Sequence, residues 1–318
     1  MLTLNEINDA YREIKDVVHR TPMLTSRSLS KKCANHIYLK SEHVQVAGAF
    51  KIRGATNKVK AAAKEGATHV ITASSGNHGQ AVAYIAGKLG LKATIVVPEN
   101  VVTSKAAAIH DYGADIIHCG TTSTERLKKA KELTTDEEPV FIPPYDDPLV
   151  MAGQGTVGLE ILEQIPDVDA VYVPIGGGGL ISGIATAIKA SNPEIKVIGV
   201  EPERGNDTYL SKQRGDITAI EHADTIADGL RASQPGDLTF PVIQKDVDDI
   251  VLVSDDAIQA ALIFVLERMK QLIEPSAAVT VAAAMANKAD MREKNICCVI
   301  SGGNMALDKL AEMVTEDA

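Results

Sequence analysis

The amino-acid sequence predicts an α/β fold built on parallel strands, and two observations carry this prediction. Short apolar runs alternate along the chain with longer stretches of helical periodicity, the pattern of strands joined by crossover helices. Hydrophobic residues make up 45% of the 318 residues, whereas aromatic residues make up only 3% and tryptophan is absent. The expected core of Ala, Val, Ile and Leu is typical of parallel sheets covered by helices. A chain of this length also favours two domains or one large α/β unit.

The individual elements follow from these patterns in chain order. Apolar runs predict strands at residues 36–40, 69–73, 93–97, 115–118, 170–175, 196–200 and 295–300. Helical periodicity is clearest at residues 4–18, 79–89, 104–112, 125–133, 156–164, 180–190, 255–272 and 276–288. Because helices separate most of the strands, we expect parallel pairing through crossover connections.

A proline-rich segment divides the chain. Residues 141–148 hold three prolines within six positions, which cannot continue a helix or a central strand. We interpret this segment as a hinge that closes a small domain inserted into a larger one. The predicted division is a large domain of residues 1–72 plus 147–318 and a small mobile domain of residues 73–146.

Charge and cysteine content limit the possible partners. The net charge of −10 argues against nucleic acids and anionic membranes, because both bind positively charged surfaces. The N-terminus has no apolar signal core, and no segment approaches the roughly 18 apolar residues needed to span a bilayer. The four cysteines show no CxxC spacing, so disulfides and thiolate metal sites are not expected. We therefore expect a cytoplasmic protein with a small polar ligand.

Lys51 directly follows Phe50 and stands two residues before Arg53. A lysine captures a carbonyl only as the free amine, and burial or a nearby positive charge lowers its pKa toward that form. Phe50 is expected to provide the apolar surface and Arg53 the positive charge. The alternative is that Lys51 and Arg53 are solvated charges at the start of a helix, since exposure is the usual state of lysine.

Four consecutive glycines, Gly176, Gly177, Gly178 and Gly179, stand between an apolar strand and a helix that continues with Leu180. Without Cβ atoms, the backbone can curl so that several amides converge on a phosphate at the positive end of the helix dipole. The run therefore predicts a phosphate site, and a plain flexible turn is the structural alternative.

The same run also allows a dinucleotide site. Gly177, Gly179 and Gly183 loosely resemble the glycine fingerprint of nicotinamide enzymes, and Glu201 ends the next strand, where a ribose-binding acid would lie. The third glycine comes one position later than in GxGxxG, so we favour the phosphate site. An NAD-dependent oxidoreductase stays open as an alternative enzyme class.

Two further strands end in polar turns, one containing Ser74, Ser75 and Asn77 and the other beginning at Ser301. Ser75 and Asn77 can bind a ligand at the start of the next helix, or a serine can simply cap that helix. Ser75 and His78 do not indicate a hydrolase, because no GxSxG elbow surrounds the serine. Because the carboxyl ends of parallel strands share one edge, we expect these turns and the glycine run to converge.

The acidic segment 201–207 holds Glu201, Gly205 and Asp207. Carboxylates and free backbone carbonyls are oxygen ligands that suit Mg²⁺ or Ca²⁺. Composition alone favours a solvated acidic loop instead.

Together these segments resemble the serine/threonine dehydratase and serine racemase family, the fold type II enzymes that use pyridoxal 5'-phosphate. The resemblance extends over nearly the whole chain. It implies a tryptophan synthase β-like fold, in which two open, twisted, mostly parallel sheets are flanked by helices and the large domain binds the cofactor. The segments that carry it are residues 48–55, 74–80, 143–148, 152–156, 174–180, 225–229, 267–270, 273–275 and 301–304.

By this resemblance, Lys51 is the Schiff-base lysine and Phe50 stacks on the cofactor ring. Ser301 faces the ring nitrogen, and Ser75 is a second acid/base on the opposite face of the cofactor. Asn77 binds the ring hydroxyl, and the glycine run with the start of the following helix holds the phosphate. The implied substrate-binding residues are Ser74, Ser75, Asn77, His78 and Arg126.

The resemblance also implies a divalent cation, Mg²⁺ or else Ca²⁺ or Mn²⁺, held by Glu201, Asp207 and the carbonyl of Gly205. It implies a homodimer that acts on a small hydroxy amino acid. The expected reaction is deamination of L-serine or L-threonine to a 2-oxo acid and ammonia, with serine racemisation alongside. A principal serine racemase and a threo-3-hydroxyaspartate dehydratase stay open as alternatives, as does a non-catalytic binding protein of the same fold.

Overall fold

Two separate sheets organise the chain, of which the computed structural model describes residues 1–134 and 139–315. The larger sheet has the order β1 (Met23–Thr25), β2 (His36–Ser41), β10 (Asn295–Ile300), β7 (Ala170–Pro174), β8 (Lys196–Pro202) and β9 (Asp249–Val253). The smaller sheet has the order β5 (Asp115–His118), β4 (Lys92–Val97), β3 (His69–Ala73) and β6 (Val140–Phe141). Neighbouring strands are parallel throughout, except for the antiparallel pair β1 and β2. The predicted α/β fold with two mostly parallel sheets is confirmed.

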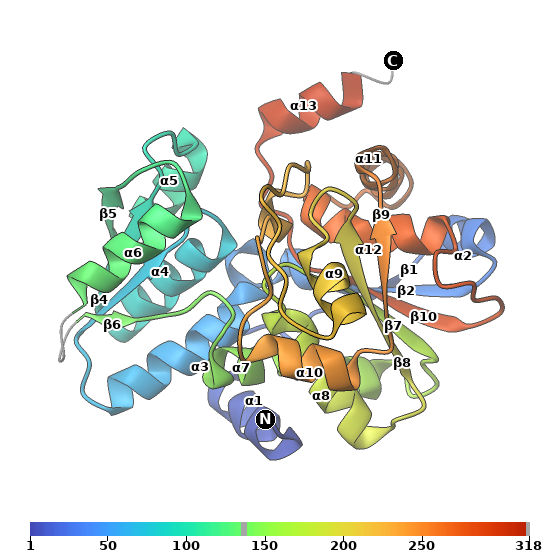
Figure 1. The fold of residues 1–318 in the computed structure, drawn as a ribbon, viewed down its shortest axis with the longest axis horizontal. Helices are drawn as coiled ribbons and strands as arrows, with labels where there is room; N and C mark the ends of the chain where they lie inside the picture. Colours follow the sequence, from blue (N-terminus) through green and yellow to red (C-terminus); the bar gives the residue numbers. More distant parts are fainter. Residues whose placement is uncertain (135–138, 316–318) are drawn as a thin grey trace.

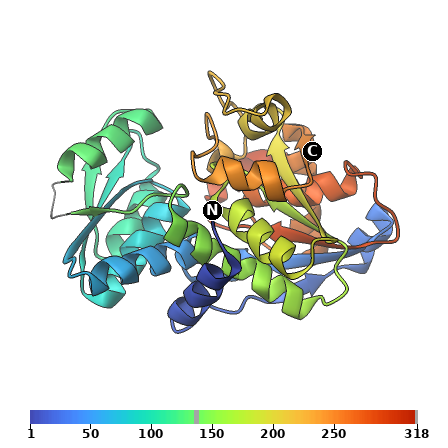
Figure 2. The same ribbon diagram turned by 60° about the horizontal axis from the view of Figure 1, so that its bottom comes forward.

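Helices cover both sheets, as Figures 1 and 2 show. They are α1 (Leu4–Ile14), α2 (Arg27–Cys33), α3 (Lys51–Lys64), α4 (Asn77–Leu89), α5 (Thr103–Asp111), α6 (Ser123–Leu133), α7 (Pro148–Gln164), α8 (Gly179–Ser191), α9 (Asp207–Arg214), α10 (Thr239–Asp246), α11 (Asp255–Phe264), α12 (Pro275–Met285) and α13 (Leu307–Thr315). Short 3-10 turns lie at Glu42–Val44, Val46–Gly48 and Asp228–Leu230, and a π turn lies at Val265–Met269. None of the helices in the described part of the chain is long and apolar enough to cross a membrane.

The larger sheet is buried on both faces. Along β7, Val171 and Val173 pack with the helices α7, α8 and α10, while Tyr172 packs on the opposite face with α2, α11 and α12. Each of these three side chains is 0% exposed. This alternation explains the aliphatic composition, because a strand covered on both faces needs apolar residues at every position.

The smaller sheet has its own apolar layers. Val70 of β3 packs with α3, α4 and α5 on one face, and Ile71 packs with α6 on the other. The predicted boundary between residues 72 and 73 falls within β3, so the smaller sheet begins before that boundary. Helix α3 thus leads from the larger sheet into the smaller one, and the segment after β6 leads back.

Helices α3 and α7 cross closely where these two connections meet. A Cβ atom on Gly153 of α7 would lie 2.6 Å from the Cα atom of Gly54 of α3. Two glycines therefore allow the helix backbones to touch, and this contact sets the position of Lys51 at the start of α3.

All the predicted strands are present, whereas several predicted helices differ at their ends. A single helix was predicted over residues 255–272. In the structure the α-helix covers only Asp255–Phe264, a π turn follows, and the helical segment ends before Lys270, whose φ of 60° is left-handed. The helix predicted over residues 4–18 ends at Ile14. Strands β1, β6 and β9 and helices α2, α9, α10 and α13 were not predicted.

Candidate active site

The start of α3 lies beside the turn that follows β10. The Phe50 amide donates a hydrogen bond of 3.0 Å to the Ser301 carbonyl, and the Gly303 amide donates one of 2.9 Å to the Gly48 carbonyl. Lys51 is the first residue of α3. The predicted convergence of Lys51 with the Ser301 turn therefore rests on direct backbone hydrogen bonds.

The amine of Lys51 contacts a backbone carbonyl and faces an aromatic ring. Its Nζ atom donates to the Pro144 carbonyl over 2.7 Å and lies 5.2 Å from the centroid of the Phe50 ring. Burial lowers the pKa of Lys51 from 10.5 to about 8, and the nearby charge of Glu274 opposes this shift. Such an amine is largely cationic at neutral pH but has an accessible free form. The carbonyl of Pro144, next to Tyr145, thus fixes the position of the Lys51 nitrogen.

Arg53 is not a solvated charge, nor does it lower the pKa of Lys51. Its side chain is 0% exposed, and its Nε and Nη2 atoms each donate to Glu42 over 2.8 Å. Its Nη1 and Nη2 atoms donate to Glu160 over 2.7 and 3.0 Å. Two carboxylates neutralise the guanidinium, so burial alone lowers the pKa of Lys51. Both interpretations of Arg53 made from its neighbours in the sequence are therefore wrong.

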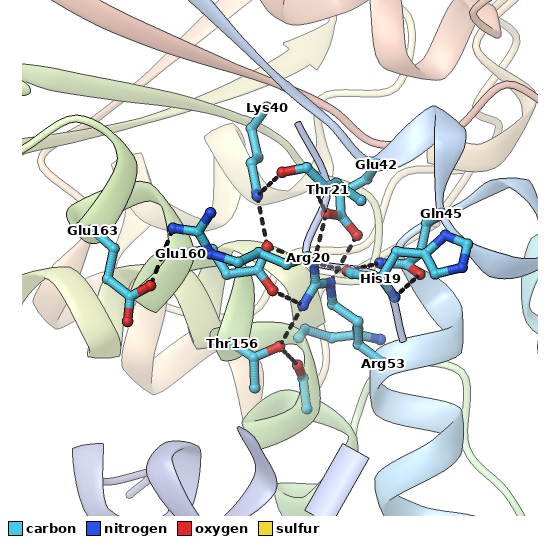
Figure 3. A network of polar contacts seen from close by, with 12 residues as sticks. His19, Arg20, Thr21, Lys40, Glu42, Gln45, Arg53, Thr156, Glu160 and Glu163 are labelled. Carbon is cyan, nitrogen blue, oxygen red and sulfur yellow. Dashed lines mark hydrogen bonds and ion pairs between the residues drawn. The ribbon is translucent and has the colours of Figure 1, made fainter. Parts of the chain in front are cut away.

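This buried cluster ties β2, α3 and α7 together (Figure 3). Lys40 of β2 donates to Glu160 over 2.6 Å and to the Thr21 carbonyl over 2.9 Å. The Thr21 hydroxyl in turn donates to Glu42 over 2.6 Å. Two cations and two carboxylates share these bonds, so no charge in the cluster is left without a partner. The cluster anchors the helix that carries Lys51.

Asn77 links the turn after β3 to the turn after β10. Its Nδ2 atom donates to Glu274 over 2.8 Å, and its Oδ1 atom accepts from Asn304 over 2.9 Å. Helix α4 begins at Asn77 with Gly76 as its N-cap and without a side-chain capping bond. The interpretation of this turn as a simple serine cap is therefore wrong, and Ser75 stays half-buried in the turn.

His78 lies close to Lys51 but is not poised to titrate near neutral pH. Its Nε2 atom is 3.0 Å from the Ile142 carbonyl, and the ring is 2% exposed. Burial, together with the charge of Lys51, lowers the pKa of His78 to about 3. The ring is therefore neutral and helps to fix the turn that carries Ser74 and Ser75.

The glycine run completes this group of turns. Gly178 has a φ of 91°, and helix α8 begins at Gly179 without a side-chain cap, so its first amides are left for a ligand. A Cβ atom on Gly177 would lie 2.4 Å from the ring of Tyr145, the residue after the hinge carbonyl that Lys51 contacts. Gly177 and Gly178 are therefore crowded positions at a helix start that favour glycine, and the run is not a plain flexible turn.

A cavity of about 690 Å³ borders these turns. Its lining includes Gln80 of α4, Lys105 of α5 and Asn304 of the segment after β10. Because Asn304 also contacts Asn77, the cavity adjoins the candidate site and offers a route of entry for a small molecule.

A family model described as "Pyridoxal-phosphate dependent enzyme" matches residues 14–302. The chain belongs to this pyridoxal-phosphate-dependent enzyme family. The resemblance inferred from the motifs is confirmed, and the chain is a pyridoxal-phosphate enzyme. The dinucleotide interpretation of the glycine run is set aside by this membership.

Individual relatives have different names. An L-threonine ammonia-lyase of Thermotoga maritima is 44% identical over 99% of this chain and 79% of its own length. An L-threo-3-hydroxyaspartate ammonia-lyase of Saccharomyces cerevisiae is 42% identical over 98% of this chain and 96% of its own length. The solved structure of maize serine racemase has a TM-score of 0.94 at 39% identity, and covers 99% of this chain and 98% of its own.

The residues present fit pyridoxal phosphate. Lys51 offers a half-buried amine with a lowered pKa, which suits the cofactor aldehyde. The uncapped start of α8 suits the phosphate, and the Asn77 amide is held in one orientation by Glu274 and Asn304. Ser301, at 3% exposed, offers a neutral hydroxyl rather than a carboxylate beside these groups.

Glu201 and Asp207 do not belong to a solvated loop, because both side chains are 0% exposed. Glu201 lies near the end of β8, and its carboxylate accepts hydrogen bonds from the Thr208 and Tyr209 amides over 3.2 and 2.7 Å. Burial, then repulsion from Asp207, raises the pKa of Glu201, and burial raises that of Asp207 to about 7. Asp207 Oδ1 is buried without a hydrogen-bond partner among the described residues. A cation would suit this pair.

No group of three or more His, Cys, Asp or Glu residues in the described ranges is arranged to hold a metal ion. The predicted set differs from such a group, since it combines two carboxylates with the carbonyl of Gly205. A Cβ atom on Gly205 would lie within 4 Å of Leu230, which also packs on Gly176. The acidic pair is thus close to the glycine run.

Arg126 lies apart from the residues that surround Lys51. It belongs to α6, on the smaller sheet, and its Nη1 atom donates to the Thr121 carbonyl over 3.3 Å. Its role in substrate binding stays a prediction.

Glu274 and Tyr145 are site residues that the sequence reasoning did not select. Glu274 contacts Asn77, and burial, followed by repulsion from Asp228, raises the pKa of Glu274 to about 7. Its signal was present, since it is the one carboxylate in the apolar run 272–279. Tyr145 had a weaker signal, because its role depends on packing against Gly177.

Proposed function

We propose that this enzyme eliminates water from L-serine, L-threonine or a close 3-hydroxy amino acid, that hydrolysis of the resulting imine then releases ammonia and a 2-oxo acid, and that the enzyme also racemises serine. The observation that carries the proposal is the half-buried Lys51 amine, which has a lowered pKa, bonds to the Pro144 carbonyl and follows Phe50, itself bonded to the Ser301 turn. The names of the relatives support the choice of hydroxy amino acids as substrates.

In the proposed chemistry, the bound cofactor withdraws electrons from the α-carbon of the substrate and so acidifies its α-proton. The Lys51 amine takes that proton, because its lowered pKa leaves a usable free-base fraction at neutral pH. The protonated Lys51 amine then gives this proton to the departing substrate hydroxyl, which leaves as water. Ser301 offers the cofactor ring a neutral hydroxyl, and the amides at the start of α8 hold the phosphate.

Ser75 is proposed as the second acid/base. It stands, half-buried, in the turn directly before α4. If Ser75 returns a proton to the face opposite Lys51, the α-carbon inverts, whereas loss of the hydroxyl leads to the keto acid. One site therefore supports both outcomes.

A substrate panel tests this function. Purified protein should be yellow, and it should release ammonia from L-serine, L-threonine or threo-3-hydroxyaspartate and form D-serine from L-serine. Chiral chromatography of the products ranks the reactions. A cofactor-loaded protein that is inert toward the whole panel would contradict the proposal and favour a binding role.

Replacing Ser75 with alanine is expected to suppress racemisation about 100-fold while elimination from L-serine falls much less. The reason is that only inversion needs a proton donor on the second face. Both products are measured from one reaction, so each serves as the control for the other. Equal loss of the two activities would contradict the two-base model.

We also propose that Glu201, Asp207 and the Gly205 carbonyl bind a divalent cation, most simply Mg²⁺. The burial of both carboxylates and the unpartnered Asp207 Oδ1 atom support this site.

Removal of the cation is expected to lower the melting temperature by about 5 °C relative to protein in excess Mg²⁺. Asp207→Asn should abolish the Mg²⁺-dependent gain, because it removes one of two ligand charges. Glu203→Gln is the matched control, since Glu203 lies in the same segment but is exposed. If neither chelator nor added Mg²⁺ changed the melting temperature of the unsubstituted protein, the proposed cation site would be contradicted.

The small domain is proposed to move against the large one during turnover. Its separate sheet, the polar contact of 2.8 Å between Lys105 of α5 and Asp228, and the proline-rich hinge support this proposal. A cytoplasmic location, supported by four free cysteines, and a homodimer complete the proposed description.

A further inference from the structure

Thr239 contacts the glycine run from the side of α10. Its Oγ1 atom donates to the Gly177 carbonyl over 2.8 Å and accepts from the Gly236 amide over 2.9 Å. Thr239 is 0% exposed and is the first residue of α10. A Cβ atom on Gly178 would lie 2.8 Å from the same Oγ1 atom, so the threonine fills the space where a side chain would stand.

Thr239 is itself held from two further directions. Its amide donates to Asp146 over 3.2 Å, and its carbonyl accepts from the Ser182 hydroxyl over 3.2 Å. Asp146 belongs to the hinge and also accepts from the amides of Asp237 and Leu238 over 3.1 and 2.8 Å. These bonds therefore fix the position of the Thr239 hydroxyl, which cannot rotate freely.

This contact decides the orientation of one peptide unit. In a trans peptide the carbonyl of one residue and the amide N–H of the next point in opposite directions. The Gly177 carbonyl points to Thr239, so the Gly178 N–H points away from α10. Gly178, with a φ of 91°, offers little resistance to rotation of this unit, because glycine populates both signs of φ. The Thr239 hydroxyl supplies the shorter of two hydrogen bonds that restrain the Gly177 carbonyl, the other coming from the Gly236 amide over 3.3 Å.

We propose that Thr239 is a positioning residue for phosphate binding: it holds the Gly177–Gly178 peptide with its N–H turned toward the phosphate. The inference rests on the proposed placement of the phosphate on the glycine run. Asp146 extends the same restraint to the hinge. The hinge and the glycine run are thus linked by hydrogen bonds through the start of α10.

The test compares pyridoxal phosphate with pyridoxal, which forms the same bond to Lys51 but has no phosphate. The full-length chain, freed of cofactor, is titrated with each compound and followed by the absorbance of the bound form. Thr239→Val keeps the shape and removes the hydroxyl, and should weaken binding of pyridoxal phosphate about tenfold. Binding of pyridoxal should change less than about twofold.

Thr239→Ser should restore the affinity for pyridoxal phosphate, because it returns the hydroxyl. Thr280→Val is the matched control. Thr280 is also 0% exposed and donates to backbone carbonyls, but it lies in the middle of α12 and its acceptors are Ala277 and Val299 rather than the glycine run. It should lower the melting temperature without changing the ratio of the two affinities. Equal weakening of both compounds by Thr239→Val, or no weakening at all, would overturn the inference.

Asp146→Asn provides a second route should Thr239→Val fail to fold. It perturbs the capping of α10 without touching the hydroxyl, and should shift the ratio of affinities in the same direction by about threefold. An unchanged ratio in Asp146→Asn would count against the proposal. If the unsubstituted chain bound neither compound, the proposed function itself would fail, so the two failures are distinguishable.

Discussion

Replacing Lys51 with alanine is expected to lower kcat by about 10⁴-fold and to abolish the borohydride-sensitive absorbance of the bound cofactor. The alanine can neither bond to the cofactor aldehyde nor take the α-proton. Lys64→Ala is the matched control, because Lys64 lies in the same helix and pairs with Glu13 with its side chain 67% exposed. Its turnover should equal that of the unsubstituted enzyme. Full turnover in Lys51→Ala would contradict the proposed roles of Lys51 in binding the cofactor and in taking the α-proton.

The pH dependence of cofactor capture provides an independent check on Lys51. The free amine is the reactive form, and the pKa of Lys51 is lowered to about 8. The rate at which cofactor-free protein captures pyridoxal phosphate should therefore rise about tenfold per pH unit below pH 8 and level off above it. An ordinary exposed lysine would continue to gain reactivity until about pH 10.4. A rate that still climbs steeply at pH 9.5 would contradict the burial of this amine.

Arg53→Met is expected to lower the free energy of unfolding by about 3–5 kcal/mol, measured by urea denaturation. The substitution leaves Glu42 buried with no cationic partner in direct contact, although Glu160 keeps its bond to Lys40. An uncompensated carboxylate in a dry site is costly, whereas the intact pair contributes little net stability. The expected loss of unfolding free energy therefore measures the cost of leaving the Glu42 carboxylate buried without its cationic partner.

Arg20→Met is the control for this prediction. Arg20 pairs with Glu163 over 3.3 Å, and the two side chains are 52% and 56% exposed (Figure 3). Solvent screens such a pair, so its loss should cost less than about 1 kcal/mol. Adding Glu42→Gln to Arg53→Met should recover part of the stability, because a neutral amide needs no counter-ion. Similar losses for Arg53→Met and Arg20→Met would refute the role of burial.

Much of the fold was predictable because interior parallel strands carry their own signal. The runs that form β7 and β10 are apolar at nearly every position, since both faces of the sheet are covered. Strands β1 and β6 have three and two residues, too few for a period to emerge. Strand β9 carries an apolar run that our prediction omits. Helix α10 has a mixed pattern, because part of its surface packs on α8 and the rest faces solvent.

The sequence by itself determined the family and the residues at the strand ends, because glycine, serine and lysine at such positions restrict the backbone and the chemistry locally. Tertiary structure alone decided their partners. Arg53 lies two residues from Lys51, yet its charge is neutralised by Glu160, 107 residues away. Asn77 is oriented by Glu274, 197 residues away. Charge interactions and burial act through space, so neighbours in the sequence predicted the lowered pKa of Lys51 but misplaced the charge of Arg53.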